Sequence, residues 1–532
     1  MTSMWPLVGG RMAKVKADKA VNLDALLKRD DFFAETEQES DTNEIRITDL
    51  EPGITFARLR KPDFQRETAN WTPQQIVDLV ETWCSGDIIP AIILWESGSR
   101  IFVVDGAHRL SALIGWINDD FGGGSISTAV YGQNIAAHQM KLHRETHDLI
   151  AKSVGSWEDF KQGHPSWSMK TLQVQWIKGR TPKQAAKAFV RINQGGTEID
   201  SLEARILFAA KSALSVATRA IVRSGVGHPY WKHFTEESAR DRVPAIGKQI
   251  HELLYEPELK SPIRDVNVPL AGAVQSTQAL RLAFDLVTTA NGMVVPDSTR
   301  SNIDKEPLPD DETGSDTLNL LRRTRKVIWM VLSKEPNSFG LHPGLWFYNE
   351  NGAFAPAALL NVVSWLLELK SRDRLDDFRK SRGRFEELML DHPSLIRPAT
   401  NKLGSGNRTR KRMVSILNEA LELIASNDDL ETVWSLLTAA HPDLQKDEEK
   451  RRDVASRGTA GASFSLSVKN AATLADLRSV PKCPLCGGLI HANGRTLDHA
   501  EKRADGGKST AANARWVHPI CNSNRDKDKA AA

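Results

Sequence analysis

The sequence is poor in cysteine, with only four in 532 residues. A disulfide framework such as small secreted domains use is therefore excluded as the main support of the fold. Three of the four, Cys483, Cys486 and Cys521, lie close together near the C-terminus, and this clustering indicates metal binding. The fourth, Cys84, lies on the apolar face of a predicted helix and is expected to be a small core residue.

The sequence also lacks a long apolar run. Its most apolar stretch, residues 352–369, is interrupted by Asn361, Ser364 and Glu368. It falls short of the roughly 20 residues that a membrane span needs. The first residues show no apolar core followed by a small-residue cleavage site, which argues against a secretory signal. We therefore expect a cytoplasmic protein without a membrane partner.

The chain also lacks an excess of charge of one sign. It contains 70 Lys and Arg residues and 67 Asp and Glu residues, which gives a net charge of +3. This balance excludes a histone-like chain but allows local basic surfaces. The chain does have 40% hydrophobic and 26% charged residues, the composition of a globular protein with sizeable cores. Its length corresponds to about three domains.

Patterns along the chain predict an α+β protein in five segments. Residues 1–44 are polar and acidic and are expected to form a flexible arm. Strand and helix patterns mix in 45–210, helical patterns dominate in 211–440, and 441–474 is typical of a linker. Residues 475–532 form a short block that is rich in Cys and His.

Capping and turn residues predict where several helices and strands of the second segment begin and end. Thr72 followed by Pro73 predicts the start of a helix, and Ser85-Gly86 predicts its end. Residues 90–95 predict a buried strand, 96–99 a turn, and 101–104 the returning strand of a hairpin. An amphipathic helix is expected to follow directly.

The C-terminal block contains two pairs of metal-ligating side chains. Cys483-x-x-Cys486 and His518-x-x-Cys521 form a set of four ligands that suits tetrahedral Zn²⁺. A block of this size buries little core, and zinc binding can supply ~10–16 kcal/mol of apparent free energy. On these ligands alone, a purely structural zinc module that binds DNA or protein stays open.

The residues between the two pairs extend this pattern. Asp498-His499 ends a predicted strand, Gly506-Gly507 opens a loop that holds Asn513, and Asn522 follows the last zinc ligand, where a final helix is expected to begin. This order resembles the HNH endonuclease family, whose fold is a small zinc-bound ββα-metal domain. The resemblance covers residues 475–532.

The HNH resemblance implies a role for each of these residues. His499 would be the general base that activates water against a phosphodiester, and Asn513 would orient it through its backbone. Asp498 and Asn522 would hold one Mg²⁺ or Mn²⁺ ion, a hard cation that suits oxygen ligands and offsets phosphate charge. Asn522 stands where the family more often has His, and His518 stands where it more often has Cys.

A second group of polar residues lies in the sequence VVDGAHRLSAL, residues 103–113. Asp105-Gly106 is expected between a strand and a helix, with His108 and Arg109 in the first helical turn. A helix N-terminus attracts anions, and an arginine can clamp a phosphate with two hydrogen bonds. Asp-Gly is also an ordinary turn, and Arg109 can equally pair with Asp105.

Two further motifs accompany this one: PDFQR at 62–66, followed by Trp71, and AFVRINQGGT at 188–197, followed by Glu203. The three together resemble the N-terminal domain family of the GmrSD modification-dependent restriction enzymes, a relative of the ParB/sulfiredoxin-like α/β fold. The resemblance implies a nucleoside triphosphate pocket at the matching positions. These positions are Gln65, Arg66, Asp105, Gly106, His108, Arg109 and Asn193.

By the same resemblance, Asp105 would lie near the hydrolysed phosphate, and Arg109 would clamp it. Ala107 and His108 stand where the family has two glutamines. The basic runs at 322–326 and 408–412 are expected either to follow a DNA backbone or to be solvated helix faces.

These observations lead to one main hypothesis and one rival. The main hypothesis is an anti-phage restriction endonuclease in which a nucleotide-binding sensor of DNA modification controls an HNH nuclease through a helical connector. The rival is a ParB-like DNA-binding regulator whose zinc module has no catalytic role. An RNA substrate and a homo-oligomeric state stay open.

Overall fold

The computed structural model describes most of the chain between residues 20 and 525. The main ranges are 20–30, 44–62, 71–132, 137–177, 201–225, 228–255, 279–295, 308–349, 352–396, 407–445 and 475–525. Shorter pieces are 65, 68–69, 135, 184, 270–271, 463–464, 468–469 and 472. Within these ranges, no helix is long and apolar enough to cross a membrane.

The chain forms two compact units, which we describe separately. The first comprises Met1–Ser215, Val226–Tyr230 and Pro296–Asp310, and the second comprises Val216–Gly225, Trp231–Val295 and Asp311–Ala532. Together they form a mixed α+β structure, as predicted. The ParB/sulfiredoxin-like fold and the five predicted segments stay predictions.

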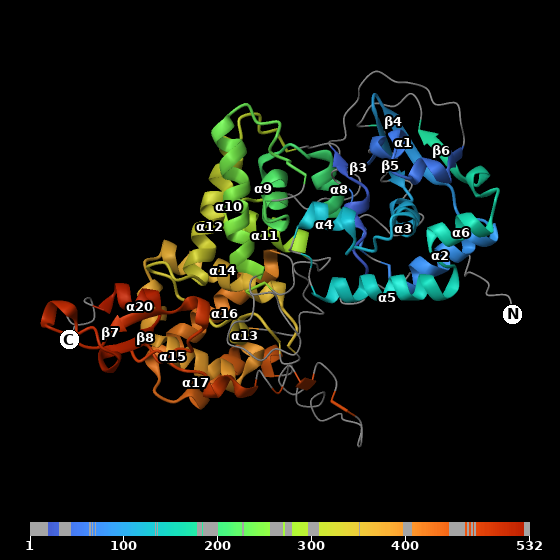
Figure 1. Ribbon diagram of the computed structural model, residues 1–532. Coiled ribbons are helices and arrows are strands. Elements are labelled where there is room, and N and C mark those ends of the chain that lie inside the picture. The colour runs from blue at the N-terminus through green and yellow to red at the C-terminus, as the bar shows by residue number, and fades with distance from the viewer. Residues whose placement is uncertain are drawn as a thin grey trace. The chain divides into compact units, whose positions relative to one another are not determined.

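The first unit is built on a six-stranded mixed sheet (Figure 1). Its spatial order is β1-β3-β5-β4-β6-β2, with β4 antiparallel to β5, β2 antiparallel to β6, and the other neighbours parallel. The strands are β1 (Arg29–Asp30), β2 (Glu44–Arg46), β3 (Leu59–Pro62), β4 (Ile92–Ser97), β5 (Arg100–Asp105) and β6 (Thr171–Ile177). The predicted hairpin is confirmed as β4 and β5.

The helices of this unit include one whose two ends the sequence marks. They are α1 (Ile54–Arg58), α2 (Pro73–Ser85), α3 (Ala107–Ile117), α4 (Ser125–Tyr131), α5 (Ala137–Ser153), α6 (Trp157–Gly163) and α8 (Ser201–Phe208). The Thr72 side chain accepts a hydrogen bond from the Gln75 N–H at the start of α2, and Gly86 ends it with φ +81°. Both predicted helices, α2 and α3, are therefore confirmed.

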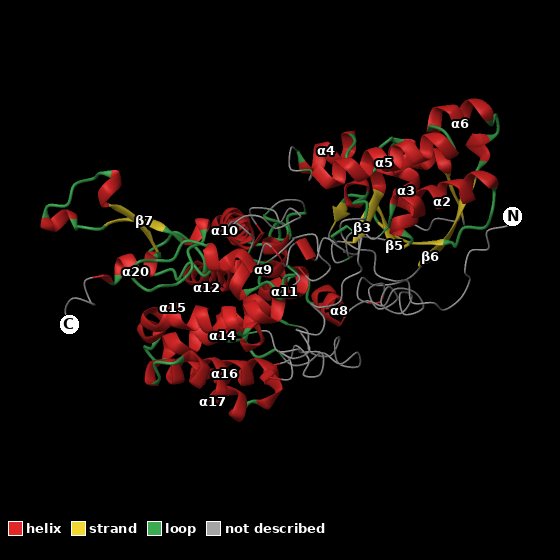
Figure 2. Ribbon diagram, turned by 90° about the horizontal axis from the view of Figure 1, so that it is seen from below, coloured by secondary structure: helices red, strands yellow, loops and turns green. Residues whose placement is uncertain are grey.

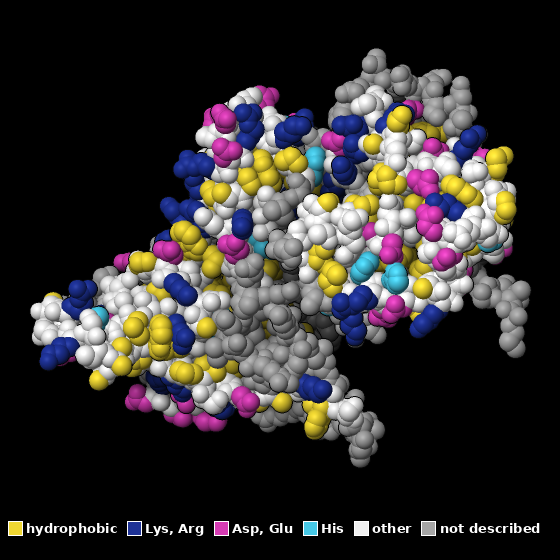
Figure 3. Space-filling model, in the orientation of Figure 1, with side chains coloured by type: hydrophobic (Ala, Val, Ile, Leu, Met, Phe, Trp, Pro, Cys, Tyr) yellow, Lys and Arg dark blue, Asp and Glu magenta, His cyan; other side chains and the backbone are white. Residues whose placement is uncertain are grey.

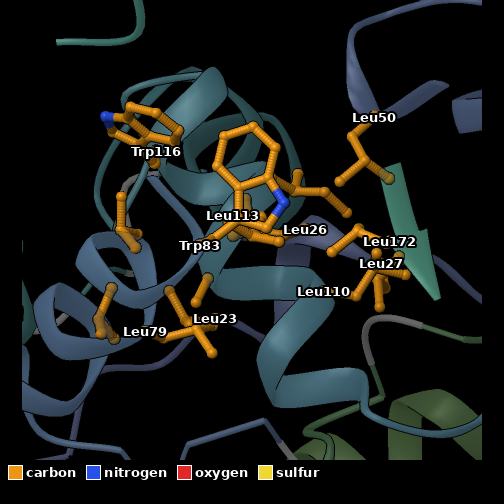
Figure 4. Packing of buried hydrophobic residues seen from close by; sticks show 14 of the residues in the cluster. Leu23, Leu26, Leu27, Leu50, Leu79, Trp83, Leu110, Leu113, Trp116 and Leu172 are labelled. Atoms are coloured by element: carbon orange, nitrogen blue, oxygen red, sulfur yellow. The ribbon is translucent and has the colours of Figure 1, made fainter. Parts of the chain in front are cut away.

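The core of this unit also contains residues ahead of the sheet. Figure 4 shows Leu23, Leu26 and Leu27 packed among the buried side chains of α2 and α3, such as Trp83 and Leu110. Residues 20–30 thus differ from the flexible arm that the acidic composition of 1–44 predicts. Ala20 to Leu27 are apolar except for Asn22 and Asp24, but this run is short and forms only one turn of 3-10 helix, so the polar composition of the whole segment hid it.

A buried charge network holds this N-terminal segment to the sheet. The Lys61 Nζ lies 2.5 Å from Asp24 Oδ1 and donates to Thr68 Oγ1, while Arg29 Nη2 lies 2.9 Å from the same carboxylate. Lys61 is completely buried. Pairing with Asp24 offsets the desolvation cost of the ammonium group.

The second unit consists mainly of helices (Figure 2). They are α9 (Ala213–Val222, which begins in the first unit), α10 (Glu237–Tyr255), α11 (Ala279–Ala290), α12 (Ser315–Val331), α13 (Pro343–Trp346), α14 (Pro356–Ser371), α15 (Leu375–Asp391), α16 (Asn407–Ser426) and α17 (Leu430–Ala440). Helix α11 packs against α12 and α14, and α16 packs against α14, α15 and α17. The helical character predicted for this region is confirmed within the described residues.

The C-terminal part of this unit is a small hairpin with a short helix. Strands β7 (Thr496–His499) and β8 (Ala514–Val517) pair antiparallel, and α20 (Pro519–Ser523) contacts β7. The strand expected to end at Asp498-His499 is confirmed. Helix α20 begins ahead of Asn522, because Pro519 suits the first helical position. Most of the helix expected after Asn522 lies outside the described residues.

Candidate metal centre and candidate nucleotide pocket

The four predicted zinc ligands converge in the second unit. One ligand atom from each of Cys483, Cys486, His518 and Cys521 lies within 4.8 Å of those of the other three. In the first knuckle, the Cys483 N–H donates to the Gly488 carbonyl and the Gly487 N–H donates to the Cys483 carbonyl, both at 2.8 Å. These bonds turn both thiols toward one point.

The second knuckle joins β8 to α20. His518 directly follows the strand and caps the helix that carries Cys521. The His518 Nδ1 lies 3.3 Å from Cys486 Sγ, while its Nε2 lies 2.9 Å from the Leu489 carbonyl. A hydrogen bond from one ring nitrogen to a carbonyl leaves the other nitrogen as a metal ligand, the usual arrangement at zinc sites.

The electrostatics of the cluster also favour a cation. Hydrogen bonds from Cys486 and Cys521 lower the pKa of the Cys483 thiol. The hydrogen bond to Cys483 raises the pKa of Cys486 to about 12, and Cys483 and Cys486 together raise the pKa of Cys521. One thiolate is thus stabilised at the expense of the others, and a bound cation would allow all three to ionise. The donor set and its geometry fit Zn²⁺.

The first knuckle is attached to helix α15 by a buried ion pair. Arg382 Nε lies 2.8 Å from Glu386 Oε1, and both side chains are almost completely buried. Glu386 Oε2 accepts the Leu489 N–H at 2.5 Å, and the Gly383 N–H donates to the Cys486 carbonyl at 2.9 Å. The zinc knuckle is therefore part of the helical unit's core.

Close backbone contact makes Gly383 necessary at this point of the helix. A Cβ added there would lie 2.6 Å from the Cys486 carbonyl and 2.9 Å from Gly487 Cα. Glycine inside a helix is destabilising by itself, so its presence in α15 is a signal for close approach. Gly383 is thus the residue whose type, read in the sequence, could have indicated this contact.

The candidate base His499 lies at the end of β7. Its Nε2 lies 3.0 Å from the Ser509 Oγ, across the loop that joins β7 to β8. Asn513 holds this loop together, because its Oδ1 accepts the Glu501 N–H at 2.6 Å and its Nδ2 donates to the Glu501 and Lys508 carbonyls. The Asn513 carbonyl also accepts the Ala500 N–H at 2.7 Å.

The Gly-Gly pair of this loop has a steric role. Gly506 has a φ of +93°, in the left-handed region. A Cβ on Gly507 would lie 2.0 Å from the Glu501 carbonyl, so only glycine fits there. Gly506-Gly507 and Asn513 therefore shape the chain that directly follows His499.

The candidate cation ligand Asp498 is paired with two arginines. Its Oδ2 lies 2.9 Å from Arg515 Nε and its Oδ1 lies 3.0 Å from Arg525 Nη1, and only 7% of Asp498 is exposed. Arg525 also donates to the His499 and Ala500 carbonyls. Since both carboxylate oxygens already accept from guanidinium groups, this arrangement does not fit a divalent cation at Asp498 as it stands.

The second candidate cation ligand, Asn522, lies in α20. Its side chain is exposed, and its backbone N–H donates to the His518 carbonyl at 3.0 Å. Asn522 is therefore positioned by the zinc knuckle, one residue after Cys521.

The candidate nucleotide pocket lies at the C-terminal end of β5. Arg109 Nη2 lies 2.6 Å from Asp105 Oδ2, and Arg109 Nη1 donates to the Pro90 and Ala91 carbonyls. The pairing of Arg109 with Asp105, which the sequence left open, is therefore present. Gly106 has a φ of +92°, and a Cβ there would meet Ile92 at 3.1 Å.

The other predicted pocket residues are placed in part. The Gln65 Nε2 donates to the Val104 carbonyl at 3.4 Å, and its buried Oε1 has no hydrogen-bond partner among the described residues. The His108 ring stacks on Trp71, with 5.6 Å between ring centroids. Arg66 and Asn193 lie outside the described residues.

The basic runs of the helical region are partly used inside the unit. Arg410 donates to Thr289 Oγ1 at 2.8 Å, and Arg412 forms two hydrogen bonds with the Asp443 carboxylate. On α12, Arg323 and Lys326 are exposed. In the run at 408–412, Lys411 is exposed among the described side chains, so both runs offer cations to an external partner.

Comparison with known proteins yields a family match in the first unit. Residues 47–210 match the family model described as "GmrSD restriction endonuclease, N-terminal domain". No curated protein and no solved structure matches the chain. The match includes β3 to β6, α2, α3 and the Asp105–Arg109 pair, and it supports a GmrSD-type restriction endonuclease family for this part of the chain.

Proposed function

We propose that this protein is a DNA endonuclease of bacterial anti-phage defence. In this proposal, a C-terminal HNH-type domain hydrolyses phosphodiesters, and the N-terminal domain binds a nucleoside triphosphate and senses DNA modification. One observation carries the nuclease: the hairpin that ends at zinc ligand His518 holds His499 beside a loop shaped by Asn513. The similarity of residues 47–210 to a restriction-endonuclease domain supports a DNA substrate.

The imidazole of His499 has the properties of a general base. An imidazole accepts a proton from water near neutral pH. Its Nε2 is within hydrogen-bond distance of the Ser509 hydroxyl, which can hold the ring in place until a water replaces it. The attack of that water on the phosphorus would expel the sugar oxygen as the leaving group.

The guanidinium groups of Arg515 and Arg525 lie on the same short hairpin and the chain that follows it. Cations of this kind attract a phosphate backbone and offset its charge. A Mg²⁺ or Mn²⁺ ion held by Asp498 and Asn522 remains our proposal for the cofactor. To reach the phosphate beside His499, it would have to displace Arg525 from Asp498, whose side chain projects from the opposite face of β7.

Plasmid cleavage tests the nuclease. The full chain is incubated with supercoiled plasmid and Mg²⁺ or Mn²⁺, alongside the His499→Ala variant and a His147→Ala control, whose side chain is half exposed on α5. We expect nicking by the wild type and the control, and a loss of about 100-fold or more in the His499→Ala variant. Equal nicking by all three proteins would remove His499 from the mechanism.

The ion pairs of Asp498 suggest a second test. If Asp498 binds the cation, then Arg525→Ala removes a competitor and lowers the Mg²⁺ concentration needed for half-maximal cleavage. Asp498→Asn should abolish cleavage while the protein keeps its zinc. An Arg525→Ala variant with an unchanged Mg²⁺ requirement would indicate that the cation binds elsewhere.

The same ion pairs favour a second candidate function. Asp498 together with Arg515 and Arg525 carries one net positive charge, which suits a zinc module that contacts a DNA backbone without cutting it. The protein would then be a ParB-like DNA-binding regulator. DNA binding without cleavage in every metal, by wild type and His499→Ala alike, would establish this function instead.

A further inference from the structure

The outer face of the β7–β8 hairpin carries two exposed apolar side chains. Leu497 is 54% exposed and Trp516 is 45% exposed, and they lie directly opposite each other in the strand register. Directly opposed residues of an antiparallel pair project from the same face. Leu497 and Trp516 therefore form one continuous patch, which we call the Trp516 patch.

An arginine lies against this patch. The Arg495 guanidinium carbon is 4.1 Å from the centre of the Trp516 ring, a cation–π contact. The contact covers part of the indole and restrains it, while nearly half of the residue stays exposed. A restrained indole that stays open to solvent beside a second exposed apolar residue offers a flat apolar surface to a partner.

The Trp516 patch shares its face of the hairpin with the candidate base. Side chains alternate along a strand, so His499, two residues after Leu497, projects to the same side. Asp498 and its cross-strand partner Arg515 project to the other side. A molecule bound over Trp516 would therefore lie next to the imidazole.

The surroundings of the patch carry a small excess of positive charge. Residues 495–525 contain six Lys and Arg residues and three Asp and Glu residues, of which Arg515 and Arg525 pair with Asp498. Figure 3 shows Lys and Arg side chains at the end of the molecule that holds this hairpin. A partner with negative charge and flat apolar surfaces is the best complement, and a nucleic acid strand has both.

We propose that Trp516, restrained by Arg495 and flanked by Leu497, stacks on an unpaired or unstacked base of the DNA strand beside His499. This inference rests on the proposed nuclease function and deepens it, because it names a positioning residue and the kind of DNA that it contacts. Stacking one base would set which phosphate lies over the imidazole. The proposed enzyme would then bind single-stranded or locally opened DNA better than a closed duplex.

The test measures binding separately from cleavage. Fluorescence anisotropy follows a labelled single-stranded oligonucleotide with full-length protein in the His499→Ala background, which prevents cutting. Trp516→Ala is expected to weaken binding roughly 5- to 100-fold, the range of one base–aromatic stack. Trp516→Phe should retain most of the affinity, and Leu436→Ala, an equally exposed apolar residue on α17, should retain all of it.

An oligonucleotide with abasic positions identifies the contact. Removing bases should weaken binding to the parent protein, whereas the Trp516→Ala variant should lose little more, because its stacking partner is already absent. Zinc content and sedimentation of each variant report folding and association. The inference would be overturned if removing bases weakened binding equally in both proteins. It would also be overturned if Trp516→Ala changed only self-association.

Cleavage by the chain with His499 intact separates this inference from the proposed function. If that chain cuts plasmid while Trp516 has no coupling to bases, the stacking inference fails and the nuclease stands. If DNA is neither bound nor cut by any variant, both fail together. If the coupling between Trp516 and the bases appears with RNA and not with DNA, the inference that the bound strand is DNA is wrong.

Discussion

The two candidate sites satisfy their charged groups in opposite ways. At the end of β5, Arg109 and Asp105 neutralise each other, and Arg109 also donates to the Pro90 and Ala91 carbonyls just ahead of β4. In the zinc cluster, three thiols and an imidazole face one another, and their mutual contacts stabilise only one thiolate. The first arrangement is complete without a ligand, whereas the second needs a cation to be complete.

This difference indicates where ligand binding and folding are linked. Removing the ligand from a self-satisfied site changes little, while removing the ion from converging thiols leaves the small hairpin without its main support. The zinc knuckle also contributes backbone groups to Arg382 and Glu386. Loss of the metal should therefore affect the helical unit as well as the hairpin.

The largest expected effect is that of a zinc-ligand substitution. Cys521→Ser should abolish stoichiometric zinc binding, which supplies ~10–16 kcal/mol in comparable modules. It should also expose the segment from Leu489 to Ile520 to proteolysis. Zinc is measured by a colorimetric chelator after denaturation, and digestion is followed by mass spectrometry.

Cys84→Ser is the matched control, because Cys84 lies in the other unit on α2 and burial raises the pKa of its thiol to about 12. We expect this variant to keep its zinc. A Cys521→Ser variant that binds zinc as the wild type does would contradict the assigned ligand set.

The second effect concerns the buried pair that attaches the knuckle. Arg382→Met leaves Glu386 buried without its cation and should destabilise the second unit by ~3–5 kcal/mol in urea unfolding. Adding Glu386→Leu should recover only part of the loss, since Glu386 also accepts from Leu489 and Trp346. Lys380→Met, an exposed position on the same helix, should change little, and a similar loss there would argue against a specific role for the pair.

The zinc ligands and the attachment of the knuckle differ in how far they could be predicted. The four ligands follow from two short spacings, and α2 follows from Thr72 and Gly86, because such signals act within a few residues. The Arg382–Glu386 pair meets Leu489 more than one hundred residues away. No local periodicity encodes such a contact, and only the glycine inside α15 hints at it.

The same reasoning explains the outcome at the candidate base. The strand ending at His499 and the Gly-Gly loop were predictable from residue types that shape the local backbone. The pairing of Arg525 with Asp498 was not, because it depends on where the chain after α20 returns to β7. The packing of Leu23 and Leu27 into the first core was missed because composition alone marked residues 1–44 as an arm.

A third effect depends on pH. His342 and His491 are buried against each other, with 5.2 Å between ring centroids, and neither ring has a hydrogen-bond partner among the described residues. Burial lowers the pKa of His342 to about 4, compared with about 6.5 in an unfolded chain. Because the unfolded chain then binds more protons between these values, stability is lost as the pH falls from about 6.5 toward about 4.

The shift of His342 corresponds to at most ~3 kcal/mol of unfolding free energy across that range. A His342→Leu variant should show a shallower decline of stability with falling pH, measured by urea unfolding at about pH 7 and about pH 5. Both proteins are kept saturated with zinc, so that loss of the metal contributes equally. Parallel declines would show that His342 stays neutral, or equally protonated, in both states.

The smallest expected effect concerns the self-satisfied pair. Asp105 is about one-third exposed and Arg109 is mostly buried, so Asp105→Asn should cost only about 1 kcal/mol or less in unfolding free energy. The same substitution releases Arg109 from its carboxylate and removes a negative charge from the candidate pocket. If nucleoside triphosphates bind there through Arg109, their affinity should rise in Asp105→Asn and fall in Arg109→Ala, as measured by titration calorimetry. A triphosphate that binds all three proteins equally would place the nucleotide elsewhere, and the Asp105–Arg109 pair would then be a structural element of the β5–α3 turn.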